Sequence, residues 1–500
     1  MERGSSHHLS RREFIRRAAC AAVGTAAMSS AIRDLRLMNA AVAQSNITDY
    51  RALVCIFLAG GNDSNNLIIP TITSEYNNYA AVRTPVLAIP QTSLLPISPL
   101  VSDGHGYGLH PCCAQLQSLF GEGRLAILFN TGTLVCPLTK ALYNSTPSKR
   151  PPQLFSHADQ VTQWQTSVPD QPALTGWGGR CADLLNAVQP GVPVSLSVTL
   201  AGANTFEVGN QVSQYSVSTS GAISLSGVSG ARLQALTNIL GLPYANLQAA
   251  AYAGVANHAV SSGALLNTAI QPTADPSSSQ QFWTTPFPGT GVFQVTTPTS
   301  GAKFSSSLGP QLKMIARLIE AGHRAATNGG FGMRRQIFFC QVGGYDLHSG
   351  QTDEPAGGSV LNGAHSNLLA ELSQSLNAFQ SAMDQIGALH SDFSFAQRVT
   401  AFTCSDFGRT FPANGQGSDH GWGSHHLILG GAVRGQQTYG AFPTLTVNGP
   451  DDTSTGRWIP TTACDQYFAT LASWFGLDNA HLLTVFPNVG RFASSNLGFV

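Results

Sequence analysis

Three aspartates of the sequence each follow a short apolar run, and glycines stand near each of them. Asp63 lies in the segment GGNDSNN, Asp346 in GGYDLHSG and Asp406 in SDFGRT, and a later loop reads SDHGWGSHH. Carboxylates that converge repel one another, so such a group is stable only where a cation or protons neutralise it. Aspartate and histidine without thiolate favour Zn, Mn, Mg or Ca. If the three segments meet, the sequence predicts a divalent metal site whose metal is left open.

The elements that would bring these segments together are continuous apolar runs bounded by turn residues. They cover residues 52–58, 336–342 and 399–404, and a fourth run covers 125–129. Runs of five to seven apolar residues without alternation are typical of central strands in a parallel sheet, because helices cover both faces. The carboxyl ends of such strands share one edge, where ligands bind. A single carboxylate there is more often a helix cap or turn, but three of them with the aspartate- and histidine-rich loop favour a shared site.

Helical patterns alternate with these runs, at residues 311–326, 366–389 and 464–475. Strands alternating with helices predict an α/β fold. The region of about 195–302 differs, since two stretches rich in Ser, Gly, Thr and Asn flank a helical pattern over 231–262. It is too long for a plain loop, and we interpret it as an inserted cap of mixed strand and helix.

The motifs GGNDSNN, GGYDLHSGQ, SDFGRTFPANG and DHGWGSHHLILGGAV, with a twin-arginine leader, resemble the DUF1501 family of exported bacterial proteins. The similarity spans most of the chain after the leader, and it is least clear in the inserted region. The resemblance implies the alkaline phosphatase and sulfatase superfamily. The expected fold is a mixed, mostly parallel sheet flanked by helices, and the expected reaction is metal-dependent transfer of phosphoryl or sulfuryl groups.

The same resemblance implies roles for individual residues. By the superfamily's order along the chain, the divalent metal ligands would be Asp63, Asp346, His348, Asp406 and His420. Arg409 would clamp the anionic group of the substrate or, equally, pair with a carboxylate of the same cluster. The metals of that superfamily polarise the ester oxygens and lower the pKa of the attacking hydroxyl.

Two features depart from the superfamily pattern. A histidine often follows the third aspartate, but Phe407 stands there, so a ligand would be lost or drawn from Asp419, His425 or His426. The nucleophile is also open, because the expected stretch offers several candidates and does not match the sulfatase cysteine motif. These candidates are Thr131, Thr133 and Cys136, with Ser64 beside the first aspartate as a further one.

Other histidines are individually weak candidates, and we expect them to be structural or on the surface. They are His105, His110, His157 and His365. The segment PPQLFSH, which ends at His157, is a loop that can approach the site.

The N-terminus predicts export through the twin-arginine translocation (Tat) machinery. The segment SRREFIR precedes an apolar stretch of about 15 residues, shorter than the roughly 20 needed to span a membrane. An Ala-Val-Ala sequence ends at Ala43, so we expect cleavage there and a mature domain over 44–500. The mature protein would lie in the periplasm or be secreted, without a membrane anchor.

Composition narrows the function classes. Of 26 basic and 26 acidic residues, 7 and 3 lie in the leader, so the remaining chain has a formal net charge of −4. This part of the chain therefore has no excess of positive charge with which to bind nucleic acid. Cysteines Cys55, Cys340 and Cys404 lie inside apolar runs and are expected to be buried. Five further cysteines can supply a disulfide, but the sequence assigns no pairs.

Three functions therefore remain open. The first is an exported metal-dependent hydrolase of small or polymeric phosphate or sulfate esters. The second is a non-catalytic surface, glycan-binding or assembly protein on a hydrolase-like scaffold. The third is a metal-free esterase of the Gly-Asp-Ser-Leu type, suggested by Gly61-Asn62-Asp63 and by the pair Asp478 and His481, although no Gly-Asp-Ser element precedes Gly61.

Overall fold

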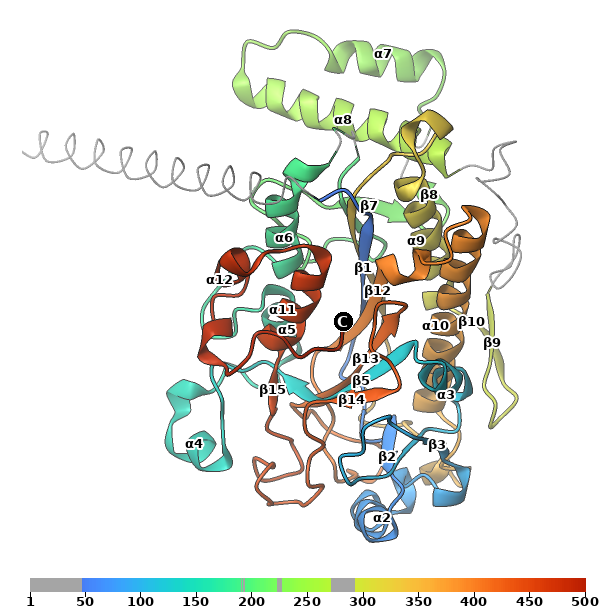
Figure 1. Ribbon diagram of the computed structural model, residues 1–500, viewed down its shortest axis with the longest axis vertical. Coiled ribbons are helices and arrows are strands. Elements are labelled where there is room, and N and C mark those ends of the chain that lie inside the picture. Colours follow the sequence, from blue (N-terminus) through green and yellow to red (C-terminus); the bar gives the residue numbers. More distant parts are fainter. Residues whose placement is uncertain (1–46, 190, 192–193, 223–226, 271–292) are drawn as a thin grey trace, which may run out of the picture.

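A ten-stranded mixed sheet forms the centre of the protein (Figure 1). The computed structural model describes residues 47–189, 191, 194–222, 227–270 and 293–500. The strand order is β14-β5-β13-β12-β1-β11-β6-β7-β8, and β15 pairs with β5. The strands are β1 Arg51–Leu58, β5 Leu125–Gly132, β6 Ser197–Thr199, β7 Tyr215–Ser218, β8 Gly221–Ala222, β11 Arg335–Val342, β12 Val399–Ser405, β13 Ser424–Gly430, β14 Gln437–Tyr439 and β15 Thr462–Ala463.

The predicted central strands are confirmed. Strand β1 lies between β11 and β12 and pairs with both in parallel, with Leu58 opposite Val342 on one side and Ser405 on the other. Seven of its eight residues are buried, as expected for a strand with both faces covered. The carboxyl ends of these three strands therefore lie side by side, as the sequence predicted.

Helices cover both faces of the sheet (Figure 1). On one face lie α3 Ala114–Gly121, α9 Leu308–His323 and α10 Ala364–Leu389. On the other lie α5 His157–Thr166, α6 Trp177–Leu185, α11 Cys464–Phe475 and α12 Leu482–Val485. Helix α9 buries Leu312, Ile315 and Ile319, which recur at helical spacing on one side. The predicted α/β fold with a mixed, mostly parallel sheet is confirmed.

The region of about 195–302 contains both strand and helix. Its strands β6, β7 and β8 extend the central sheet at one edge. Helices α7 Ala231–Leu240 and α8 Leu247–Ala269 form a hairpin at the end of the molecule, beyond β7 and β8 (Figure 1). Part of the predicted cap therefore continues the main sheet. That the region of about 195–302 is an insertion into the main domain stays a prediction.

Smaller elements complete the described chain. A three-stranded sheet contains β2 Ile68–Pro70, β3 Leu95–Ile97 and β4 Tyr107–Leu109, and a two-stranded sheet contains β9 Gln294–Thr296 and β10 Lys303–Ser305. Helix α2 covers Thr73–Leu87 and α4 covers Lys140–Ser145. The predicted leader, residues 1–43, lies outside the described residues. Within those residues no helix combines the length and the apolar character that crossing a membrane requires.

The cysteines in the central strands are buried, as predicted for Cys55, Cys340 and Cys404. All eight cysteines of the described residues are unpaired in this structure. Burial raises the pKa of the Cys340 thiol well above its ordinary value. These thiols behave as small apolar groups of the core.

Candidate metal centre

The candidate centre lies where the three central strands end. Asp406 directly follows β12, and Asp346 comes four residues after β11. The backbone of Gly60, just beyond β1, passes between them: a Cβ atom there would lie 2.3 Å from the backbone nitrogen of Asp346. Its φ of 117° is also one that side chains rarely allow. Only glycine permits this close approach.

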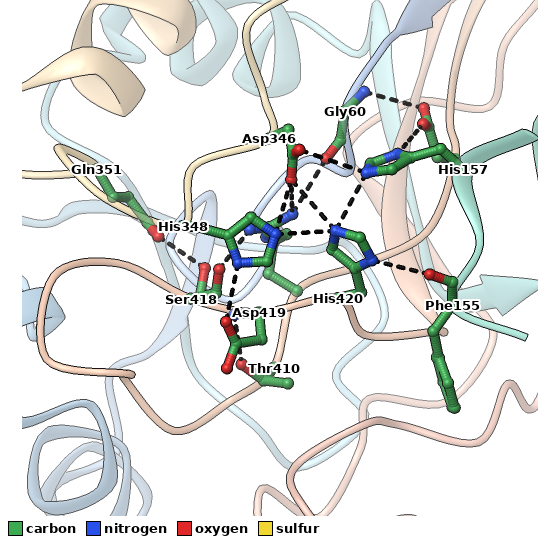
Figure 2. A network of polar contacts seen from close by, with 12 residues as sticks. Gly60, Phe155, His157, Asp346, His348, Gln351, Thr410, Ser418, Asp419 and His420 are labelled. Carbon is green, nitrogen blue, oxygen red and sulfur yellow. Dashed lines mark hydrogen bonds and ion pairs between the residues drawn. The ribbon is translucent and has the colours of Figure 1, made fainter.

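His157, Asp346 and His420 form a compact group that can hold a metal ion (Figure 2). The Nε2 atoms of the two histidines are 3.1 Å apart. The Asp346 carboxylate oxygens lie 3.4 Å from Nε2 of His157 and 3.3 Å from Nε2 of His420. His157 is the first residue of α5, and His420 lies in the loop before β13. Three segments far apart in sequence thus place one donor atom each in the same small space.

The other ring nitrogens fix the orientation of both imidazoles. Nδ1 of His420 is 2.8 Å from the carbonyl oxygen of Phe155, which can only accept a hydrogen bond. Nδ1 of His157 is 2.6 Å from Oδ2 of Asp406. In the neutral rings Nδ1 therefore carries the proton, and Nε2 presents a lone pair toward the centre. Metal-bound histidines in proteins have this arrangement, with the outer nitrogen donating to a carboxylate or carbonyl.

The separations between donor atoms also match a coordination sphere. Metal–nitrogen bonds of about 2.0–2.1 Å place neighbouring ligand atoms roughly 3.0 Å apart in an octahedron and roughly 3.4 Å apart in a tetrahedron. The two histidine nitrogens are 3.1 Å apart, and each lies near a different oxygen of the Asp346 carboxylate, His157 at 3.4 Å from Oδ2 and His420 at 3.3 Å from Oδ1. Two lone pairs and a carboxylate so close together repel unless a positive charge lies between them. The donor set therefore fits a cation.

The protonation states favour ligation. Burial acts to raise the pKa of Asp346, but the hydrogen bond and charge of Arg409 outweigh it, so this pKa lies below its ordinary value. Burial lowers the pKa of His420, and the hydrogen bond to Phe155 opposes this only in part. Asp346 is thus ionised and His420 neutral near pH 7, the forms that bind metals.

His348 lies at the exposed edge of the group. Its Nε2 is 2.9 Å from Nε2 of His420 and 3.2 Å from Oδ1 of Asp346. Its Nδ1 is 2.9 Å from Oδ1 of Asp419, so this ring too has an oxygen acceptor on its outer side. Asp419 also accepts a hydrogen bond from Asn414, 3.0 Å long. His348 therefore lies beside the group, but it is not one of the three residues that form it.

Asp406, expected as a ligand, is not a member of the group and contacts the outer nitrogen of His157 instead. One carboxylate oxygen faces Nδ1 of His157, and the other accepts the backbone N–H of Gly60 at 3.0 Å. Its neighbour Phe407 is buried, with ring centroids 4.8 Å from His157 and 4.7 Å from His420. Phe407 stands where the superfamily pattern often has a histidine, and its ring packs against both imidazoles.

Asp63 is not brought together with this group. It is 2% exposed and forms a buried ion pair with Arg83 of α2, which is fully buried. The Gln351 side chain donates to the same carboxylate oxygen. Burial acts to raise the pKa of Asp63, but the charge of Arg83 outweighs it and the pKa is lowered. The carboxylate follows β1 as expected, but the Arg83 guanidinium supplies the positive charge beside it, where the superfamily resemblance implies a metal ion.

Arg409 pairs with a carboxylate of the cluster, which is the second of its two expected roles. Its side chain is fully buried, and its guanidinium donates to Oδ1 of Asp346 at 2.7 Å, to the Gly60 carbonyl at 3.2 Å and to the Ser418 carbonyl. These contacts hold Asp346 in place. They leave the guanidinium covered rather than presented to a substrate.

Of the nucleophile candidates, Thr131, Thr133 and Ser64 are buried, whereas Cys136 is partly exposed. The Thr133 hydroxyl donates to Oε1 of Gln160 at 2.8 Å, and the Ser64 hydroxyl accepts the backbone N–H of His425 at 3.0 Å. His425 and His426, considered as replacement ligands, are buried in β13, where Nδ1 of His425 accepts the N–H of Asn130. None of these side chains belongs to the group His157, Asp346 and His420.

His157, one of the histidines expected to be structural or on the surface, is a member of the group. The signal available in the sequence was its position at the end of the segment PPQLFSH, where helix α5 begins. Two residues of this loop, Gln153 and Phe155, have positive φ values of 52° and 73°. Such a backbone conformation is unusual for these residues and cannot be read from single-residue preferences.

Comparison with known proteins assigns the chain to a family without assigning it an activity. The family model described as "Protein of unknown function (DUF1501)" matches residues 50–483. No curated protein matches the sequence.

Proposed function

Because the chain belongs to the DUF1501 family, for which no function is described, we propose its function from the site itself. The protein is an exported, metal-dependent hydrolase of phosphate or sulfate esters. The single observation that carries the proposal is the convergence of His157 Nε2, His420 Nε2 and the Asp346 carboxylate within bonding reach of one ion.

The site is open enough for a substrate to reach it. The side chains of His157, Asp346 and His348 are 35%, 46% and 45% exposed, whereas structural metal sites are usually closed. A bound divalent metal would polarise an ester oxygen and activate water. Imidazole donors favour Zn or Fe over Mg, Ca and Mn, which suit oxygen ligands. We propose His348 as the fourth protein ligand.

The protein's own residues hold this centre in shape. Arg409 fixes Asp346 through a buried hydrogen bond, and Asp406 and the Phe155 carbonyl fix the two imidazole rings. The predicted nucleophiles Thr133 and Ser64 are buried and bonded elsewhere. Water is therefore the attacking group that we propose, in a single displacement.

Phosphate and sulfate esters are the proposed substrates because of the superfamily resemblance of the motifs around Asp63, Asp346 and Asp406. A single displacement by water inverts the configuration at a chiral phosphorus atom, whereas a covalent enzyme intermediate retains it. The stereochemical outcome with a chiral phosphate monoester therefore tests the attacking group separately from the substrate class.

The direct test of the function uses the mature exported protein with a panel of aryl phosphates and aryl sulfates. Alanine at Asp346 or His420 should lower kcat/KM by more than about 100-fold, since even outer partners of metal ligands contribute about 10–100-fold. His390 provides the matched control, because it pairs with Glu320 outside the group, so His390→Ala should leave turnover unchanged. If Asp346→Ala and His420→Ala turn over the esters as fast as His390→Ala, the proposed function is wrong.

The two other functions predict different results. A non-catalytic binding protein would hold the metal and turn over no ester of the panel. A metal-free esterase would keep its activity after chelation. The Asp478 and His481 side chains contact each other locally, at 2.6 Å, next to a short helix that Asp478 caps.

We also propose that the protein is exported by the Tat machinery and cleaved after Ala43. This proposal rests on the leader sequence alone. The exported protein should begin at Gln44, which N-terminal sequencing checks. Replacing Arg11 and Arg12 by lysine should retain the precursor in the cytoplasm, and unchanged export would contradict the proposal.

A further inference from the structure

A hollow of about 520 Å³ includes Phe155 in its wall, the residue whose carbonyl oxygen is hydrogen-bonded to His420 of the candidate metal centre. It is formed by the segment from α4 to the loop before α5, and its lining includes Tyr143, Arg150, Leu154, Phe155 and Asp170. This volume is within the usual range for small-molecule sites, about 300–1,000 Å³. Its lining combines aromatic and aliphatic surface with charged groups.

Phe155 connects the hollow to the centre. Its carbonyl oxygen accepts the hydrogen bond from His420, while its ring points away from the histidines (Figure 2). Phe155 is one of the residues that line the hollow. His157 comes two residues later in the chain, so one segment contributes both to the wall of the hollow and to the candidate metal centre, although neither histidine lines the hollow. The Arg457 guanidinium stacks over the Phe155 ring at 4.2 Å and donates to the His420 carbonyl, which fixes this wall.

Arg150 gives the hollow a positive charge. Its guanidinium lies 4.1 Å from the centre of the Tyr143 ring, and its Nε donates to the Tyr143 carbonyl at 2.5 Å. Within the described residues it forms no ion pair with a carboxylate. The other charged wall residue, Asp170, is neutralised by Arg491 at 2.8 Å and accepts a further hydrogen bond from Asn488. A guanidinium oriented by stacking and free of a carboxylate suits an anionic ligand group.

We propose that this hollow binds an anionic sugar unit, sulfated or phosphorylated, that adjoins the ester held at the metal centre. A sugar ring has an apolar C–H face, which suits Phe155 and Leu154, and anionic substituents at its rim, which suit Arg150. This inference rests on the proposed function, because it names the substrate class of that function: a sulfated or phosphorylated oligosaccharide.

The test measures binding of three disaccharides by calorimetry to the mature exported protein: one sulfated, one phosphorylated and one neutral. Arg150→Gln should weaken binding of the anionic disaccharides by about tenfold or more, as expected for loss of a charged hydrogen bond. Binding of the neutral disaccharide should not change. Arg150→Lys should restore part of the affinity. The control is Arg232→Gln, because Arg232 is exposed on α7.

The anionic disaccharide that binds more tightly identifies the substituent. No binding of either one to the wild-type protein, or equal binding to wild type and Arg150→Gln, would overturn the inference. If Arg150→Gln does not fold, Arg150→Lys is compared with the wild-type protein instead. It should bind the anionic disaccharides more weakly than wild type and the neutral disaccharide equally well. Unchanged affinity for the anionic disaccharides would count against the inference. Arg150-dependent binding without turnover of any ester would uphold this site while the proposed hydrolase fails. Aryl ester turnover without Arg150-dependent binding would do the reverse.

Discussion

Replacing Asp63 by asparagine separates a structural carboxylate from a metal ligand. The superfamily resemblance implies a ligand at this position, but the structure pairs Asp63 with buried Arg83. The same guanidinium donates to the carbonyls of Thr410 and Phe411, so it is fixed where it lies. In the Asp63→Asn variant this positive charge remains buried without a counter-charge.

The magnitude follows from burial. Both side chains are almost completely inaccessible, at 0% and 2% exposure, and breaking such a pair by removing one partner costs about 3–5 kcal/mol. For a chain of roughly 450 residues, with an unfolding entropy of about 2.1 cal/mol/K per residue, this corresponds to a fall in Tm of about 3–5 °C. The control Asp392→Asn breaks the partly exposed pair with Arg398, where the cost is about 0–1 kcal/mol.

The assay combines thermal unfolding by calorimetry with metal analysis of the same samples. Asp63→Asn should lower Tm by several degrees relative to the control and retain its metal. If the variant instead keeps its Tm and loses the metal, Asp63 is a ligand and the interpretation of the Asp63–Arg83 pair is refuted.

Three further changes probe the centre and the core. Asp406→Asn should weaken metal affinity by about 10–100-fold in a chelator competition, because this carboxylate orients His157; unchanged affinity would exclude that role. Gly60→Ala should lower the free energy of unfolding by at least about 1–3 kcal/mol in denaturant titration, because of its positive φ and the approach of Asp346; a neutral result would contradict the packing. Burial raises the pKa of Glu207 to about 8, so the folded state keeps a proton that the unfolded state releases. Its contribution to stability is complete below the unfolded pKa of 4.5 and is lost as pH rises through about 8, with a slope of up to about 1.4 kcal/mol per pH unit. Glu207→Gln should flatten this fall, and parallel curves would refute the assignment.

The strands that position the site could be predicted from the sequence, because buried strands appear in it as continuous apolar runs. Continuous apolar runs identified β1, β11 and β12, and the rule that parallel strands end at one edge placed Asp346 and Asp406 together. Helix α11 was predicted with the bounds that the structure has, residues 464–475.

The direction of individual side chains could not be predicted in this way. Whether a carboxylate after a strand faces a metal, an imidazole or a guanidinium depends on contacts distant in sequence: Asp63 and Arg83 are 20 residues apart, and Asp406 and His157 are 249 residues apart. His157 was undervalued for the same reason, because the unusual backbone at Phe155 brings it to the centre. The pattern of apolar residues along the chain predicts which edge of the sheet carries the site. Which side chains face the centre depends on tertiary contacts.

The most direct test of the metal centre is elemental analysis of the mature exported protein by mass spectrometry, in wild type and in His157→Ala, His420→Ala and His390→Ala. The arrangement of donors predicts about one transition-metal ion per chain in wild type and His390→Ala, with loss of the ion in the other two variants. A wild-type protein that carries no metal after export, or metal that persists when both His157 and His420 are replaced, would contradict it.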